Sequence, residues 1–153
     1  MNNSRRNLLT AAPLAAAAAF AQAQPAPVKA GKTKRVYYPD GKTASKEIPI
    51  YSEVVSYGDT VFVSGHGVNT SADVRKQTAA VLDRIEKCLH SAGSSMQNAL
   101  KCNVYLQLLE DYAAMNEIYR GRFGPEPPVR TCVAVAGIPL KGCLVEIEVI
   151  AGV

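Results

Sequence analysis

The sequence predicts a single α+β domain in which two helices pack on one face of a sheet. Two segments, 71–91 and 110–123, carry apolar residues at the three- and four-residue spacing of an amphipathic helix. Around them lie short segments rich in β-branched and aromatic residues, several of which alternate apolar and polar side chains. The predicted order is β-β-β-α-β-α-β-β, and such a mixture is typical of a layer of helices on a layer of sheet.

The N-terminal half of the domain is predicted to form three strands. A short strand at 35–38 is ended by Pro-Asp-Gly, which is a turn sequence. A second strand at 50–57 and a β-branched third strand at 60–64 form a hairpin around Gly-Asp. We expect the Gly-His-Gly sequence at 65–67 to break the third strand.

The clearest helix is predicted at 71–91. Ser71 is the expected N-cap, and Gly93 can adopt the left-handed conformation that ends a helix. The apolar stripe of this helix is expected to consist of Val74, Val81, Ile85, Cys88 and Leu89.

The C-terminal half is predicted to form a strand, a helix and two further strands. Alternating residues mark a strand at 99–106, and the second helix at 110–123 is stopped by Gly-Pro-Glu-Pro-Pro. In this helix Tyr112, Met115 and Tyr119 are spaced for burial. The last two strands are expected at 129–135 and 144–150, joined by a turn at 137–142.

The first 23 residues are predicted to be an export signal that takes no part in the fold. Two arginines precede an alanine-rich apolar run at 8–20, and Ala-Gln-Ala at 21–23 has the pattern of a cleavage site. The order Ser-Arg-Arg-x-Leu-Leu favours the twin-arginine type, with an ordinary secretory signal as the alternative. We therefore expect a periplasmic or secreted protein without membrane attachment after cleavage, a flexible linker at 24–33 and one domain at 34–153.

Charge and cysteine content exclude some functions. The chain has 17 Lys and Arg against 13 Asp and Glu, and loss of two arginines with the signal leaves a net charge of +2. This charge is too small to predict a nucleic-acid partner. The four cysteines include no C-x-x-C pair and there are only two histidines, so no zinc site is predicted. Buried thiols are the expectation for Cys88 and Cys102. The disulfide state of all four cysteines, which also include Cys132 and Cys143, stays open.

Two places near the C-terminus depart from the local pattern. Arg130 follows a diproline and opens a core strand, although arginine is rarely buried unless it binds an anion such as a carboxylate. Glu146 and Glu148 share one face of the last strand. The plain alternatives are a half-exposed arginine paired with a local acid and a pair of solvent-facing glutamates. A shared site requires one glutamate to reach Arg130 across the sheet, and the short turn between the last two strands favours that geometry.

The residues around Arg130 and Glu146 closely resemble the C-terminal signature of the reactive intermediate deaminase family (RidA or YjgF-like, also called the L-PSP endoribonuclease family). The signature corresponds here to 128–133 and 144–148. Further segments are similar to that family in the same order, and the resemblance runs from about residue 50 to the C-terminus. These segments are 58–65, 77–82, 92–95 and 112–119.

The resemblance implies a chorismate-mutase-like α+β fold and a homotrimer with sites in the clefts between subunits. It implies hydrolysis of 2-imino or enamine acids to 2-oxo acids and ammonia, without metal or organic cofactor. By resemblance Arg130 would hold the substrate carboxylate, Glu146 would position or activate water, and the backbone at Cys132 would contact the imine. The residues that would line the cleft are Tyr51, Ser64, Gly65 and Asn116.

His66 departs from the family pattern, which usually has glutamine after Ser-Gly. The segment that follows it, 67–70, is also shorter than usual. His66 would be a pocket-wall residue, a hydrogen-bond partner or a second proton carrier. These departures keep two alternatives open, a trimer that binds small carboxylic acids without catalysis and, less favoured, a ribonuclease.

Overall fold

The computed structural model describes residues 32–41, 44 and 46–153 of the chain. The predicted export signal at 1–23 and most of the linker predicted at 24–33 lie outside the described residues. In the part of the chain that is described, none of the helices has the length and apolar character needed to cross a membrane.

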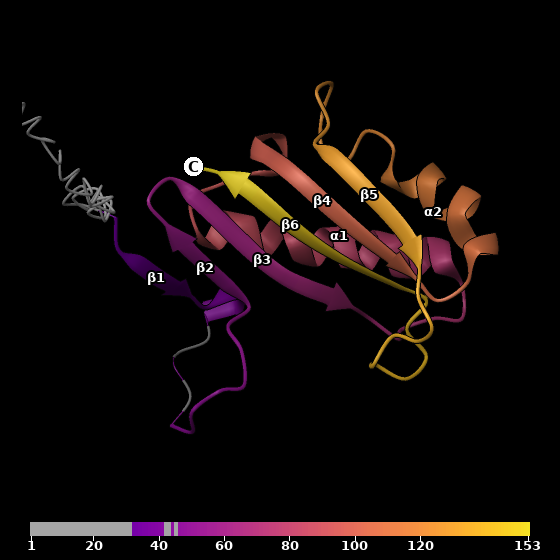
Figure 1. Cartoon of the computed structure of the whole chain (residues 1–153), viewed down its shortest axis with the longest axis horizontal. Helices are drawn as coiled ribbons and strands as arrows, with labels where there is room; N and C mark the ends of the chain where they lie inside the picture. Colours follow the sequence, from indigo (N-terminus) through magenta and orange to yellow (C-terminus); the bar gives the residue numbers. More distant parts are fainter. Residues whose placement is uncertain (1–31, 42–43, 45) are drawn as a thin grey trace, which may run out of the picture.

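The domain is a two-layer structure with a mixed six-stranded sheet (Figure 1). The strand order is β1-β2-β3-β6-β4-β5, and neighbouring strands are antiparallel except β4 and β5, which are parallel. The strands are β1 (Lys34–Tyr37), β2 (Val54–Tyr57), β3 (Thr60–Gly67), β4 (Ala99–Leu106), β5 (Val129–Ala134) and β6 (Val145–Gly152). The predicted order of strands and helices is confirmed.

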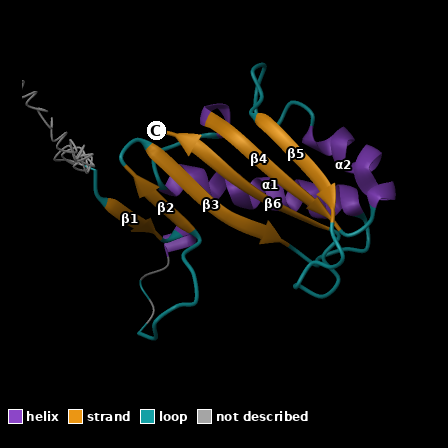
Figure 2. Cartoon of the chain, in the orientation of Figure 1, coloured by secondary structure: helices purple, strands orange, loops and turns teal. Residues whose placement is uncertain are grey.

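The helices α1 (Val74–Ser91) and α2 (Tyr112–Tyr119) form the second layer (Figure 2). The helix α1 crosses behind the central strands in this view, and α2 packs beside it next to β5. Three short 3-10 turns complete the fold at Pro39–Gly41, Met96–Asn98 and Leu109–Asp111. One face of the sheet is therefore covered by helices, and we call the other its open face.

The helix α1 begins later than predicted. Its N-cap is Asp73, whose carboxylate accepts a 2.8 Å hydrogen bond from the backbone N–H of Arg75. Ser71 instead accepts a hydrogen bond from the backbone N–H of Asp73 and belongs to the preceding turn. The end of the helix is as predicted, with Gly93 at φ 77°. The predicted apolar stripe is confirmed, because all five of its residues are buried in the core.

The helix α2 is shorter than the predicted 110–123. Residues before it form a 3-10 turn, and Arg120 leaves the helical conformation with ψ 129°. Met115 and Tyr119 are buried as expected, but the predicted burial of Tyr112 is wrong. The Tyr112 side chain is 43% exposed and faces Arg130.

A bulge in β3 carries this strand through the Gly-His-Gly sequence that was predicted to break it. Val63 is paired with Val149 and His66 with Ile147, so that the two residues between Val63 and His66 face only Glu148. The extra residue reverses the alternation of sides beyond the bulge. His66 consequently lies on the helix face, beside buried Ile147, and not on the open face.

A second register shift lies at the start of β4. Ala99 is paired with Ala151 and Lys101 with Ile150, so Leu100 is left out of the ladder. Leu100 is 57% exposed although simple alternation predicts it inside, and Ala99 is buried in its place.

Candidate functional site

Arg130 lies near the start of β5 in a cradle of uncharged groups that α2 supplies. Its Nη1 donates a 2.7 Å hydrogen bond to Asn116 Oδ1, and its Nη2 donates a 3.3 Å hydrogen bond to the Tyr112 hydroxyl. The guanidinium carbon lies 4.7 Å from the centroid of the Tyr119 ring, within the range of a cation–π contact. Within the described part of the chain Arg130 makes no ion pair. The alternative of an arginine paired with a local acid is therefore wrong.

Helical and strand spacing explain how the sequence builds this cradle. Tyr112, Asn116 and Tyr119 are four and three residues apart on α2, which places them on one face of the helix. Arg130 is in parallel register with buried Cys102 of β4, so both side chains point to the helix face of the sheet.

A cavity of about 580 Å³ opens beside the guanidinium group of Arg130. It is of the size that holds small-molecule ligands. Its walls come from α2, the glycine- and proline-rich segment that follows α2, and the start of β5. The lining residues are Tyr112, Asn116, Tyr119, Arg120, Gly121, Phe123, Gly124, Pro125, Pro127 and Arg130.

The groups that pack beside Arg130 stay uncharged at neutral pH. Burial raises the pKa of the Cys102 thiol to about 11. Burial likewise raises the pKa of the Tyr119 hydroxyl, and it raises that of Cys132 against the lowering effect of Arg130. Because none of these groups carries a negative charge at neutral pH, the positive charge of Arg130 is available to a bound anion.

Glu146 lies on the open face near the start of β6, packed against the bulge of β3. A Cβ atom at Gly65 would overlap Glu146 Oε1, so only glycine lets the carboxylate lie at this place. No hydrogen bond or ion pair is made by the Glu146 side chain to any of the described residues. The carboxylate borders a hollow of about 190 Å³ whose other walls come from Tyr105, Val135 and residues 137–139.

Glu148, two residues further along β6, is held within the sheet through one of its two carboxylate oxygens. Its Oε1 accepts hydrogen bonds from Asn103 Nδ2 at 2.6 Å and from the Tyr105 hydroxyl at 3.1 Å. Of the two glutamates that share the open face, Glu146 is therefore the one whose side chain makes no hydrogen bond to the described residues. Glu148 lines the hollow that Ser64 also borders.

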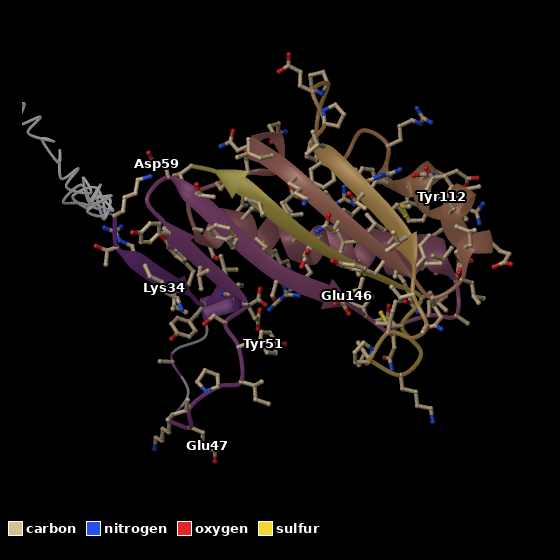
Figure 3. The ribbon with its side chains drawn as sticks, viewed as in Figure 1. Lys34, Glu47, Tyr51, Asp59, Tyr112 and Glu146 are labelled. Atoms are coloured by element: carbon tan, nitrogen blue, oxygen red, sulfur yellow. The ribbon has the colours of Figure 1, made fainter. Side chains whose placement is uncertain are left out.

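Arg130 and Glu146 lie on opposite faces of the sheet within one chain. The strand β4 separates β5 from β6, and Glu146 is paired with Tyr105 on the open face while Arg130 is in register with buried Cys102. Figure 3 shows Glu146 on β6, apart from Tyr112 on α2, which contacts Arg130. The expectation that a glutamate reaches Arg130 across the sheet of one chain is therefore wrong.

Of the remaining predicted site residues, two lie with Arg130 and two lie elsewhere. Asn116 contacts Arg130 directly, and Cys132 lies two residues along β5 on the same face. Ser64 borders a hollow of about 300 Å³ on the open face, where its buried Oγ has no hydrogen-bond partner among the described residues. Tyr51 precedes β2 and is 66% exposed.

His66 is not grouped with Arg130 or with Glu146. Its ring lies on the helix face, where Nε2 is 3.4 Å from Cys88 Sγ. This position does not support the expectation that His66 lines the substrate cleft. Among the described residues, Glu53, His66 and Cys88 form one group whose ligand atoms could hold a metal ion.

Sequence reasoning missed Tyr112 and Tyr119 as neighbours of Arg130. Both were interpreted only as core residues of the second helix, and Tyr119 serves both purposes because its ring is buried under the guanidinium. Their spacing from Asn116 was a signal in the sequence, since all three residues share one helix face.

Comparison with known proteins identifies the family of this chain. The sequence pattern of the family described as Endoribonuclease L-PSP matches residues 42–153. A RutC family protein of Pyrococcus abyssi is 37% identical over 115 residues, which cover 71% of this chain and 90% of that protein. The mitochondrial protein mmf2 of Schizosaccharomyces pombe is 36% identical over 108 residues, covering 66% of this chain and 86% of that protein.

Solved structures show the same architecture. A member of the YjgF protein family from Neisseria meningitidis superposes with a TM-score of 0.65 at 31% identity, covering 78% of this chain and 94% of that one. Yeast Mmf1 superposes with a TM-score of 0.70 at 28% identity, covering 78% and 98%. The domain thus has the α+β fold of YjgF proteins. The chain belongs to the Endoribonuclease L-PSP family, also called the YjgF/RidA family.

Proposed function

We propose that this protein hydrolyses reactive 2-imino or enamine acids to 2-oxo acids and ammonia at sites shared between two subunits of a homotrimer. The observation that carries the proposal is the division of one chain into two complementary halves. One half offers a cation that has no acidic partner among the described residues, Arg130, beside a cavity. The other offers an available carboxylate, Glu146, on the open face.

Arg130 is suited to bind the carboxylate of such a substrate. Its planar guanidinium can donate two parallel hydrogen bonds to a carboxylate. Asn116 and the Tyr119 ring fix the orientation of the guanidinium without neutralising its charge. A substrate held in this way would have its imine carbon two bonds from a fixed anchor, which restricts the direction from which water can approach.

Glu146 is suited to act on the attacking water. An iminium carbon is already electrophilic, so the reaction needs an oriented water and one proton acceptor. Water oxygen adds to the imine carbon while Glu146 passes one water proton to the nitrogen, which gives a carbinolamine. The remaining hydroxyl proton then passes through Glu146 to the nitrogen as the carbon–nitrogen bond breaks and the carbon–oxygen double bond forms. The products are a 2-oxo acid and ammonia, and Glu146 returns to its starting charge.

Opposite faces of one sheet cannot present Arg130 and Glu146 to the same small substrate. A second copy that packs its Arg130 edge near the Glu146 of the first copy would bring the two groups together. Closed cyclic symmetry repeats the same pair of surfaces at each interface, so a trimer would form three such sites.

The proposal is tested by imine hydrolysis with the purified protein lacking residues 1–23. An amino-acid oxidase generates imines from a panel of amino acids, and semicarbazide traps the imines that remain. We expect the wild-type protein to remove imines. The rate should fall at least about a hundredfold in Arg130→Ala, because this variant lacks the cation that would pair with the substrate carboxylate. The matched control is Arg35→Ala, an exposed arginine on β1 at the opposite edge of the sheet.

Equal rates for Arg130→Ala and the wild-type protein would remove Arg130 from the mechanism. The cavity beside Arg130 is complete within one chain, and this observation favours a second candidate function, capture of small carboxylic acids without catalysis. Binding of 2-oxo acids that depends on Arg130, without imine turnover on the whole panel, would establish that function. Because the family carries the description Endoribonuclease L-PSP, cleavage of RNA should be measured alongside.

A further inference from the structure

The fold brings three side chains with metal-binding chemistry together on the helix face of the sheet. Glu53 precedes β2, His66 follows the bulge of β3, and Cys88 lies on the core side of α1. One ligand atom from each residue lies within 4.8 Å of the other two. His66 Nε2 and Cys88 Sγ lie 3.4 Å apart.

The fold itself fixes these positions. The bulge in β3 turns His66 from the open face to the helix face, where α1 lies. The backbone N–H of Ser64, within the same bulge, donates a 3.0 Å hydrogen bond to the carbonyl oxygen of Glu53. Cys88 belongs to the buried stripe of α1, so its thiol points toward the sheet.

We propose that Glu53, His66 and Cys88 form a binding site for a zinc-class divalent cation. Imidazole nitrogen, thiolate sulfur and carboxylate oxygen are the three kinds of protein ligand that Zn²⁺ takes. With bonds of about 2.3 Å to sulfur and about 2.1 Å to nitrogen, a tetrahedral ion holds these two ligands roughly 3.6 Å apart. The observed 3.4 Å between His66 and Cys88 fits that spacing with little movement.

Arg84 lies beside the three ligands, where it forms ion pairs with Glu53 and Asp40. A divalent ion binds the thiolate form of Cys88, so its binding would release the thiol proton. The Arg84 ion pair is made through Glu53 Oε2, and a carboxylate has a second oxygen that can bind the metal.

Solvent can reach the site from one side. Glu53 and His66 are partly exposed, whereas Cys88 is fully buried at the inner end. Three protein ligands leave a fourth position for water. A bound ion would join the segment before β2, the end of β3 and α1, and it would therefore stabilise the fold against heat. This site could not be predicted from the sequence, because its three ligands come one each from three distant segments. Zinc motifs are usually recognised by pairs of ligands that are a few residues apart.

Cobalt(II) titration of the reduced, untagged protein lacking residues 1–23 tests the proposal. We expect about one Co²⁺ per chain, a thiolate-to-cobalt charge-transfer band in the near ultraviolet and displacement of the cobalt by Zn²⁺. His66→Gln and Glu53→Gln should each weaken binding at least about tenfold, because loss of outer partners alone costs that much. His90→Gln removes the exposed second histidine of the chain and should bind like the wild-type protein.

Thermal unfolding gives an independent measurement. Zn²⁺ should raise the Tm of the wild-type protein and of His90→Gln, and raise it less in His66→Gln, whose fold is checked by circular dichroism. Cys88→Ala should bind Co²⁺ more weakly than the wild-type protein, and any Co²⁺ that it binds should show no thiolate-to-cobalt band. The proposal is overturned if the wild-type protein binds neither ion at micromolar concentration, or if His66→Gln and His90→Gln bind equally well.

Discussion

The surroundings of Arg130 and of Glu146 differ in how much of a site each contains. Arg130 lies in a cavity whose walls, hydrogen-bond partners and aromatic contact all come from one chain. Glu146 lies on an open sheet face with a glycine beneath it and a small hollow beside it. Under the proposed function, the first place would bind the substrate carboxylate and the second would supply the reactive group. Binding and chemistry would then be contributed by separate surfaces.

The largest expected effect is loss of the available carboxylate. Glu146→Gln should reduce imine hydrolysis by about 10²–10⁴-fold, because the amide cannot accept a proton from water. The control is Glu148→Gln on the same strand and face, whose carboxylate is already held by Asn103 and Tyr105. The rates of imine hydrolysis of the two variants are compared in the semicarbazide assay. A larger loss of rate in Glu148→Gln than in Glu146→Gln would show that Glu148, and not Glu146, provides the reactive carboxylate.

A smaller loss is expected when the position of the Glu146 carboxylate is disturbed. In Gly65→Ala the new methyl group would overlap Glu146 Oε1 and push the carboxylate aside. Displacement of a reacting group by about 1 Å can cost as much as 10²-fold, so we expect a rate loss of about 10- to 10²-fold. The substrate dependence should show this loss in kcat, with little change in KM. A normal kcat in a folded Gly65→Ala protein would argue against a role for this contact.

Mixed trimers test whether the two surfaces meet between subunits. Arg130→Ala and Glu146→Gln chains are coexpressed with different tags and purified through both tags. If each site takes Arg130 from one subunit and Glu146 from the next, about one of the three sites in every doubly tagged trimer regains both groups. The mixture should then be far more active than either variant alone. Activity no higher than that of the separate variants would contradict a shared site.

The order of strands and helices could be predicted because strand alternation and helical spacing can both be recognised directly in the sequence. The strand 99–106 and the buried stripe of α1 were predicted correctly for this reason. The bulge beside Gly65 and the register shift at Leu100 leave no comparable trace, since each depends on pairing with a distant strand. Boundaries that depend on caps, such as Asp73 in place of Ser71, were also missed.

The same limit applies to the candidate site. The sequence identified Arg130 and Glu146 as unusual residues, but their faces depend on the parallel pairing of β4 with β5 and on the strand order. His66 is the clearest case, because one extra residue in β3 places it against Cys88 and not beside Glu146. Residue types could thus be predicted from local pattern, whereas their grouping required the long-range register.

The smallest expected effect concerns the buried thiol of Cys102, which is uncharged at neutral pH and lies beside Arg130. Burial raises the pKa of Cys102 to about 11, above its ordinary value of 9.0, so the folded protein holds this proton more tightly than the unfolded chain. The resulting stability is fully present below pH 9 and is lost as the pH rises toward 11. Between pH 9 and pH 11, the free energy of unfolding should therefore decrease less in a protein without this thiol than in the wild-type protein, by on the order of 2 kcal/mol. Urea unfolding of the wild-type protein and Cys102→Ala at pH 8 and at several values up to pH 11 measures the difference. Equal slopes for the two proteins would mean that Cys102 is more accessible to water than its place beside Arg130 implies.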